Sequence, residues 1–298
     1  MKPRPVRNLR LPFHLEKALL ASGAFLCFCS LGITLGLTQS IPSSPLDGEK
    51  LDFEVTYQWG PIYLEVGDVS FTTQRLDYAD VQLWSFEGWG TSRAHWNWFY
   101  PVNSIYTSLA NTMLDPLNFH RKGREGSHRY DRWYFLKDST RISWVSHDDE
   151  LSNGELIPTQ SSKAIHDVMT AVHWCRHLDW PSARPGESTP MNLILDGEIH
   201  QTTISFQGIQ EWIHPKTQET HTCWVFEPVL IEGTVFKAGD RMRVFVTADE
   251  RRLPVFVETE LVVGAARIYL EGESQLSISE MQAHRKHSQS ERDEFFVR

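Results

Sequence analysis

The amino-acid sequence predicts a mainly β fold: a curved or partly closed antiparallel β-sheet meander with one packed amphipathic helix, behind an N-terminal hydrophobic segment. Three observations lead to this prediction. Apolar and polar residues alternate with a period of two in many short stretches, which is typical of half-buried strands. Turn-forming residues separate these stretches. A single segment has the apolar spacing of a helix instead.

The strand pattern is clearest at Leu51–Tyr57, where apolar and polar residues alternate without a break. Gly60-Pro61 interrupts it, alternation resumes over Ile62–Val66, and Gly67-Asp68 leads into Val69–Phe71. The later predicted strands are Val81–Phe86, Trp133–Leu136, Ile142–Val145, Met191–Leu195, Thr202–Phe206, Trp224–Val229, Met242–Thr247, Val255–Leu261 and Ala266–Glu271. Short turn sequences between them, such as Asp196-Gly197, favour hairpins. An open sheet of this many strands tends to curl, so we expect a concave face.

One segment, Ile165–Leu178, departs from this pattern. Its apolar side chains fall at helical spacing, Asp167 stands in the first turn, and Trp180-Pro181 follows its end. We therefore expect a single helix whose apolar stripe packs on the sheet.

The hydrophobic segment is Ala18–Leu37, preceded by five cations and followed by Pro- and Ser-rich residues. It has the basic leader of a signal peptide, and it also has about the length of a membrane span, roughly 20 residues. Both interpretations remain open, and both place the rest of the chain outside the cytoplasm, periplasmic or anchored facing the periplasm. We accordingly divide the chain into a basic leader (1–17), a signal peptide or membrane anchor (18–40), one exported β-rich domain (41–280) and a charged tail predicted to be disordered (281–298).

Charge and cysteine content narrow the function classes. Residues 41–298 contain 24 basic and 37 acidic residues, a formal net charge of −13, which argues against nucleic acid as a partner. The same residues contain two cysteines, Cys175 and Cys223. In an oxidising compartment these could form one disulfide, and two buried free thiols are the equal alternative.

The order of several short motifs resembles the bacterial domain-of-unknown-function family 3108, over roughly Leu46 to Ser274. The motifs are Gly48–Tyr57, Trp59-Gly60, Gly67-Asp68-Val69, Leu114–Phe119, Asp167–Arg176, Phe236–Asp240, Val246–Val255 and Val263–Ala266. The resemblance implies an exported, β-rich protein whose function is not established, and it supplies no catalytic residues.

An aromatic cluster extends from residue 84 to residue 100. Trp84, Trp96, Trp98 and Tyr100 are its candidate ligand-binding residues, and the last three would share one face of an extended strand. Aromatic faces in a cleft stack on sugar rings or line an apolar pocket. The competing interpretation, which is the more common outcome, is that a large sheet buries these rings in its core.

Three histidines of the predicted helix, His166, His173 and His177, are the candidate metal ligands. His173 and His177 have the i, i+4 spacing of two zinc ligands on a helix, although Trp174 stands where a zinc protease has its glutamate. The simpler interpretation is that these histidines lie on a solvated polar face of the helix. We therefore expect no cofactor, and zinc is the one alternative that we consider. Two charged runs, His120–Arg124 and Asp249–Arg252, are predicted to be a loop with solvated charges and a hairpin tip.

The leading hypothesis is a non-enzymatic envelope protein that binds an apolar, lipid-like or glycan ligand, or a partner, on the concave face of the sheet. The membrane is a further partner through the N-terminal segment, if that segment is not cleaved. The alternatives are a metal-assisted hydrolase of envelope polymers, using the helix histidines, and a structural or assembly protein of the envelope.

Overall fold

The structure is a computed structural model that describes residues 46–283, except 79–80, 99, 139–140, 149–152, 157–164, 230–240, 262–263 and 278. The predicted hydrophobic segment (18–40) and residues 284–298 of the predicted tail lie outside the described residues. In the described part of the chain, no helix is long and apolar enough to cross a membrane.

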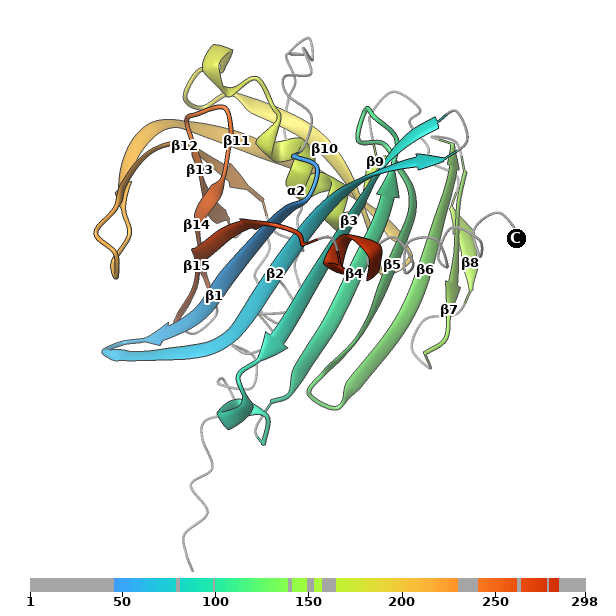
Figure 1. The fold of residues 1–298 in the computed structure, drawn as a ribbon, viewed down its shortest axis with the longest axis horizontal. Helices are drawn as coiled ribbons and strands as arrows, with labels where there is room; N and C mark the ends of the chain where they lie inside the picture. The colour runs from blue at the N-terminus through green and yellow to red at the C-terminus, as the bar shows by residue number, and fades with distance from the viewer. Residues whose placement is uncertain are drawn as a thin grey trace, which may run out of the picture.

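The described residues form one large sheet of fifteen strands (Figure 1). The strands are β1 (Glu49–Trp59), β2 (Ile62–Tyr78), β3 (Val81–Ser92), β4 (Val102–Ala110), β5 (Pro116–Glu125), β6 (His128–Asp138), β7 (Arg141–Ser146), β8 (Gly154–Leu156), β9 (Ile165–His166), β10 (Ser188–Leu195), β11 (Glu198–Ile213), β12 (Thr220–Pro228), β13 (Met242–Thr247), β14 (Pro254–Glu260) and β15 (Ala265–Gln275).

The strand order confirms the predicted antiparallel meander. Each strand from β1 to β8 pairs with the next, and the same holds from β9 to β15. β1 and β15 pair with each other and join the two runs into one sheet. All pairs are antiparallel except β9 with β10. The sheet is open, with β8 and β9 as its two ends.

The hydrophobic core lies on one face of this sheet. In β1, Leu51, Phe53, Val55 and Tyr57 are all buried, as their alternation predicts. Each such side chain contributes roughly 1.5–3 kcal/mol when it leaves water. The same face of the later strands adds rings such as Phe226, which stacks on Trp180 in the short 3₁₀ helix η4 (Trp180–Ser182).

The predicted helix is α2 (Val168–Arg176), which lies inside the curve of the sheet (Figure 1). It begins at Asp167, whose carboxylate accepts hydrogen bonds from the backbone N–H groups of Met169 and Thr170. The Thr170 hydroxyl in turn accepts from the Asp167 N–H, which completes a capping box. The helix packs against β3 and β4 on one side and β9 and β10 on the other.

Besides the β1–β15 pairing, the carboxylate of Asp196 connects the two halves of the sheet. Asp196 lies in the β10–β11 turn and accepts hydrogen bonds from Arg121 in β5 and Arg132 in β6. Asp196 and Gly197 both have positive φ, at 49° and 76°, as a two-residue Asp-Gly hairpin turn requires. The predicted Asp196-Gly197 hairpin is therefore confirmed.

Two local predictions are wrong. Residues 94–96 form a 3₁₀ helix, η3 (Ala94–Trp96), in the β3–β4 connection, so Trp96, Trp98 and Tyr100 do not share a strand face. The basic run His120–Arg124 is part of β5, where Arg121 is buried and bound by Asp196. Basic residues indicated a solvated loop, but a carboxylate from the other half of the sheet allows the Arg121 guanidinium to be buried.

Candidate functional site

Core side chains and α2 pack against the concave face of the sheet, so we do not place the ligand site there. Phe86 in β3, Phe119 in β5 and Met169 in α2 are all fully buried on this face. α2 itself takes the central volume between β3 and β10. A cavity that could hold a ligand opens instead on the opposite, outer face of β1–β4.

The four predicted aromatic residues are dispersed. Trp84 and Tyr100 are buried in the core. Trp96 is half-buried against the core and donates its indole N–H to the Glu65 carbonyl at 2.9 Å. Trp98 is 74% exposed, in the β3–β4 connection. None of the four lines the outer-face cavity.

The predicted metal ligands are not brought together: His166 and His173 are buried, and His177 is half-buried. His166 lies in β9 beside Trp174, and burial lowers its pKa to about 4. His173 stacks on Phe86 at 4.0 Å, and burial lowers its pKa well below the usual value. Burial also lowers the pKa of His177, to about 4, and its ring is tied to the His173 carbonyl at 2.7 Å. Within the described residues, no three His, Cys, Asp or Glu side chains are grouped so that they could hold a metal ion.

Cys175 and Cys223 are free thiols, so the disulfide that the sequence left open is not formed between them. Cys175 is on α2 and Cys223 on β12, and α2 packs mainly against β3, β4, β9 and β10. Burial raises the pKa of both thiols, that of Cys223 to about 12. Both are therefore core side chains in their unreactive protonated form.

The outer-face cavity has a volume of about 470 Å³ and is built around Trp89. This indole is 54% exposed, and its N–H donates to the Glu87 carboxylate at 2.7 Å. Trp89 lies opposite Ser70 in β2 and Ile105 in β4. The hydrogen bond fixes the ring by its edge, so its faces remain for contact with an apolar group. We call this cavity the Trp89 pocket.

Strand parity places Trp89 on the outer face. Trp84, Phe86 and Gly88 face the core, where a Cβ on Gly88 would lie 3.0 Å from the Phe71 ring and 3.1 Å from the Met169 sulfur. The alternate residues Glu87 and Trp89 must then point outward. Trp89 belongs to the aromatic cluster seen in the sequence. It is an odd number of residues from Trp84 along the strand, so the alternation of a strand places the two rings on opposite faces.

The C-terminal part of the described chain forms the second wall of the pocket. Leu276 and Ala283 contribute apolar surface, and a short helical turn at residues 279–283 crosses in front of the sheet (Figure 1). Glu280 holds this turn because it accepts hydrogen bonds from the Ser277 hydroxyl and backbone N–H, which lower its pKa to about 2. Ser277-x-x-Glu280 is a capping-box pattern, a local signal from which this turn could have been predicted.

Polar groups complete the lining of the pocket. Lys50 in β1 pairs with Glu280 at 3.3 Å, and Ser70 and Thr72 come from β2. A volume of this size with apolar walls and a few polar side chains is typical of small-molecule sites. The lining includes Glu87 and Glu280, but no histidine or cysteine, among the described residues.

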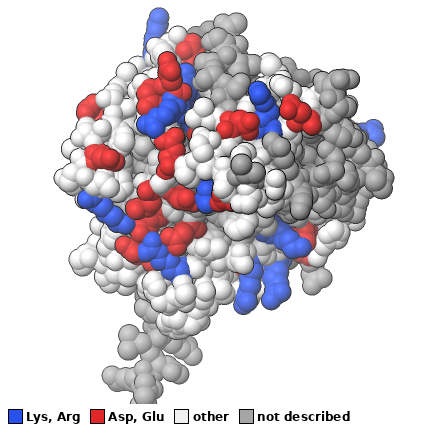
Figure 2. All heavy atoms as spheres, in the orientation of Figure 1, with Lys and Arg blue, Asp and Glu red and all other residues white. Residues whose placement is uncertain are grey.

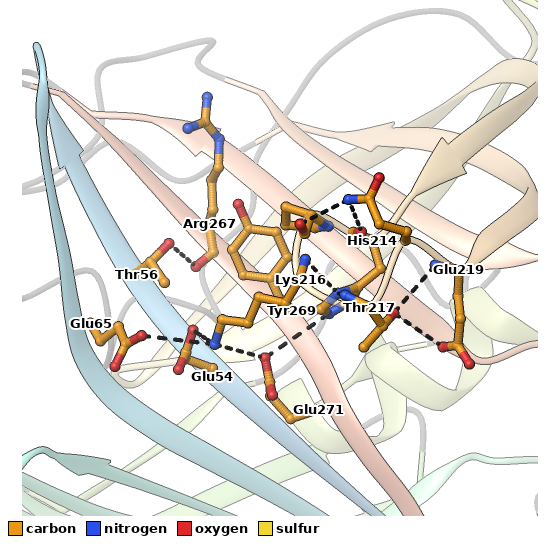
Figure 3. A network of polar contacts seen from close by, with 12 residues as sticks. Glu54, Thr56, Glu65, His214, Lys216, Thr217, Glu219, Arg267, Tyr269 and Glu271 are labelled. Carbon is orange, nitrogen blue, oxygen red and sulfur yellow. Dashed lines mark hydrogen bonds and ion pairs between the residues drawn. The ribbon is translucent and has the colours of Figure 1, made fainter.

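A second group of charged side chains, shown in part in Figure 3, is held in ion pairs. The Lys216 ammonium, in the β11–β12 turn, lies 2.6 Å from Glu54 in β1 and 3.2 Å from Glu271 in β15. Glu54 also accepts from Arg93 at 2.7 Å. Hydrogen bonding to Glu54 and Glu271 raises the pKa of Lys216. These contacts hold the β11–β12 hairpin against the sheet, so the cluster is a structural clamp.

Comparisons with known proteins support the fold and the family. The profile of the family described as "Protein of unknown function (DUF3108)" matches residues 52–271. No curated protein matches the chain. Among solved structures, the chain is similar to a Brucella abortus protein described as a beta-barrel-like protein of domain of unknown function DUF1849.

That likeness has 8% sequence identity and a TM-score of 0.50, and covers 79% of this chain and 100% of the Brucella chain. At so low an identity it concerns the fold alone. The family match covers most of the chain, from the middle of β1 to the end region of β15. The protein is therefore a member of the DUF3108 family of proteins of unknown function.

Proposed function

We propose that this protein is exported to the cell envelope and binds the apolar part of a lipid-like ligand in the Trp89 pocket, without catalysing a reaction. The hydrophobic run Ala18–Leu37 with its basic leader supports export. The pocket supports ligand binding, since its volume of about 470 Å³ lies in the range of ligand sites.

The observation that carries this proposal is the exposure of Trp89. Trp89 does not belong to the hydrophobic core, and its indole N–H donates to the Glu87 carboxylate at 2.7 Å. The ring therefore leaves a large apolar surface facing the cavity. Ile105, Leu276 and Ala283 extend that surface. An alkyl chain would remove these side chains from water at roughly 25 cal/mol for each Å² buried.

A titration of the exported protein with decyl maltoside, below its micelle concentration, tests the proposal by calorimetry. We expect saturable binding that Trp89→Ala weakens by roughly tenfold or more, because the indole supplies much of the apolar contact. Trp98→Ala is the matched control, since Trp98 is also exposed but does not line the pocket.

Three results would contradict the proposal: no binding of decyl maltoside, equal binding by the Trp89→Ala variant, or a loss of binding in Trp98→Ala alone. Titration with maltose separates the glycan hypothesis. Maltose binding as strong as that of decyl maltoside would assign the pocket to a sugar and overturn the lipid-like ligand.

A further inference from the structure

A second cavity, of about 1140 Å³, lies beside the Trp89 pocket at the ends of β4–β6. Ile105 lines both cavities. It pairs with Trp89 across β3–β4 and with Lys122 across β4–β5. The outer face of the sheet therefore leads without a break from the indole of Trp89 to the basic end of β5.

Two arginines face each other in this second cavity. Arg124 in β5 and Arg129 in β6 are direct cross-strand partners, and both are exposed. Like charges in directly opposed positions destabilise a sheet. In Figure 2, Lys and Arg side chains gather below the centre of this face, where the β5–β6 connection lies. We call Arg124 and Arg129 the arginine pair.

The arginine pair has no carboxylate partner within the described residues. Arg124 donates its Nε–H to the Gly126 carbonyl at 2.8 Å, and the neighbouring Asp131 is taken by Lys122 at 2.6 Å and His120 at 2.9 Å. The other cross-strand arginine pair of these strands, Arg121 and Arg132, is bound by Asp196 and Asp148. The fold thus neutralises one arginine pair and leaves the other to solvent.

An anion is the ligand that suits two opposed guanidinium groups. Cross-strand partners have Cβ atoms about 4.5–5.5 Å apart, so both side chains can reach one oxyanion. Arginine binds phosphate and carboxylate groups through paired N–H donors. The exported residues have a net charge of −13, which repels anions elsewhere on the surface, so binding at the arginine pair would be local.

We infer that the ligand of the Trp89 pocket is an anionic amphiphile, whose phosphate-bearing head group lies between Arg124 and Arg129 while its chain crosses Ile105 to Trp89. This inference rests on the proposed function and specifies the ligand class. Lys122 lies two strands away from Trp89 in the same row of the sheet, and Arg124 is two residues further along β5. The standard spacings of a sheet then put Arg124 about 12 Å from Trp89. A single alkyl chain spans that separation.

The test compares decyl phosphate with decyl maltoside, which share the chain and differ in the head group. By calorimetry on the exported protein, we expect Arg124→Gln/Arg129→Gln to weaken decyl phosphate binding by roughly tenfold or more. The same variant should leave decyl maltoside within about twofold, because its chain contacts are unchanged. Added salt should weaken decyl phosphate binding selectively.

The double variant Arg75→Gln/Arg184→Gln is the matched control. It removes the same charge from two exposed arginines that line neither cavity. We expect it to change neither affinity by more than about twofold, since distant surface charges are screened. An equal effect of both double variants would mean that net charge alone attracts the anion, and would overturn the inference.

Two further outcomes would overturn the inference without touching the proposed function. One is unchanged decyl phosphate affinity in Arg124→Gln/Arg129→Gln while Trp89→Ala still weakens decyl maltoside binding. The other is binding of inorganic phosphate as tight as that of decyl phosphate, which would make the arginine pair a site for free phosphate, independent of any chain. Failure of decyl maltoside to bind would instead contradict the proposed function itself.

Discussion

Buried polar side chains set the pH response of this protein, because the charged forms of His166 and Asp167 are both penalised inside the core. Burial lowers the pKa of His166 to about 4 and raises that of Asp167 to about 6. The stability contributed by neutral His166 is present above its unfolded pKa and is lost as the pH falls through about 4. That contributed by Asp167 is present below its unfolded pKa and is lost as the pH rises through about 6.

The pKa values of His173 and His177 are lowered in the same way as that of His166. We therefore expect the free energy of unfolding to fall on acidification from pH about 6.5 to about 4. His166→Leu should reduce this acid-induced loss by roughly 3 kcal/mol. Urea denaturation at several pH values measures it. His95→Leu, at an exposed position, should leave the loss as it is in the unaltered protein. An equal loss in the protein and its His166→Leu variant would contradict this account.

The burial, exposure and cross-strand pairing of single residues could not be predicted from the sequence. The spacing of the helix histidines was visible in the sequence, but the burial of His166 and His173 was not, because it depends on β3, β4 and β10 packing against α2. Trp89 was visible in the aromatic cluster, yet its exposure depends on the outer face of β3. The arginine pair requires the β5–β6 register, which no local pattern in a basic run indicates.

At the scale of elements, strands with one apolar face were predictable and those with mixed faces were not. β1 follows clean alternation over Leu51–Tyr57, whereas β4 and β5 carry side chains such as Ser108 and Arg121 on the core side. Those polar groups are satisfied by distant partners, Asp167 and Asp196. α2 was predictable because its cap and its apolar spacing are both local.

The close approach of β3 to α2 gives a test of the packing that orients Trp89. Gly88→Ala should destabilise the fold by about 1–3 kcal/mol, since the new Cβ would press on Phe71 and Met169. Gly90→Ala is the control on the same strand, because its Cβ would meet only Val69, at 4.0 Å. Thermal unfolding of both variants measures the difference. Equal stability of the two would contradict the placement of β3 against α2.

At the scale of the whole molecule, the sheet remains open but its two halves are joined across α2 by Asp196. Arg121 and Arg132 are both buried. Removal of Asp196 leaves Arg121 without a carboxylate partner among the described residues, while Arg132 keeps Asp148. Because the Asp196 side chain is 49% exposed, we expect Asp196→Asn to cost about 1–3 kcal/mol of unfolding free energy, less than a fully buried pair would. Glu198→Gln, exposed on the same hairpin, should change it by less than about 0.5 kcal/mol. An Asp196→Asn variant as stable as Glu198→Gln would show that the halves are held together by other contacts.

The fold class was predictable for this molecule, and the location of the ligand site was not. Curvature follows from the number of strands, but what fills the concave side follows from the position of α2. The outer face acquires its pocket because Leu276, Glu280 and Ala283, far from β3 in sequence, lie against it. Such contacts between distant segments are set by the assembled molecule.

The central claim is that a lipid-like ligand binds at Trp89 on the outer face. Heteronuclear NMR of the indole N–H groups during a decyl phosphate titration tests it most directly, with each resonance assigned by its Trp→Phe variant. We predict a saturable shift of the Trp89 resonance, because the ligand would lie against a ring whose N–H binds Glu87. The resonances of buried Trp84 and exposed Trp98 should not move. A saturable shift of Trp98, with Trp89 unchanged, would contradict the account.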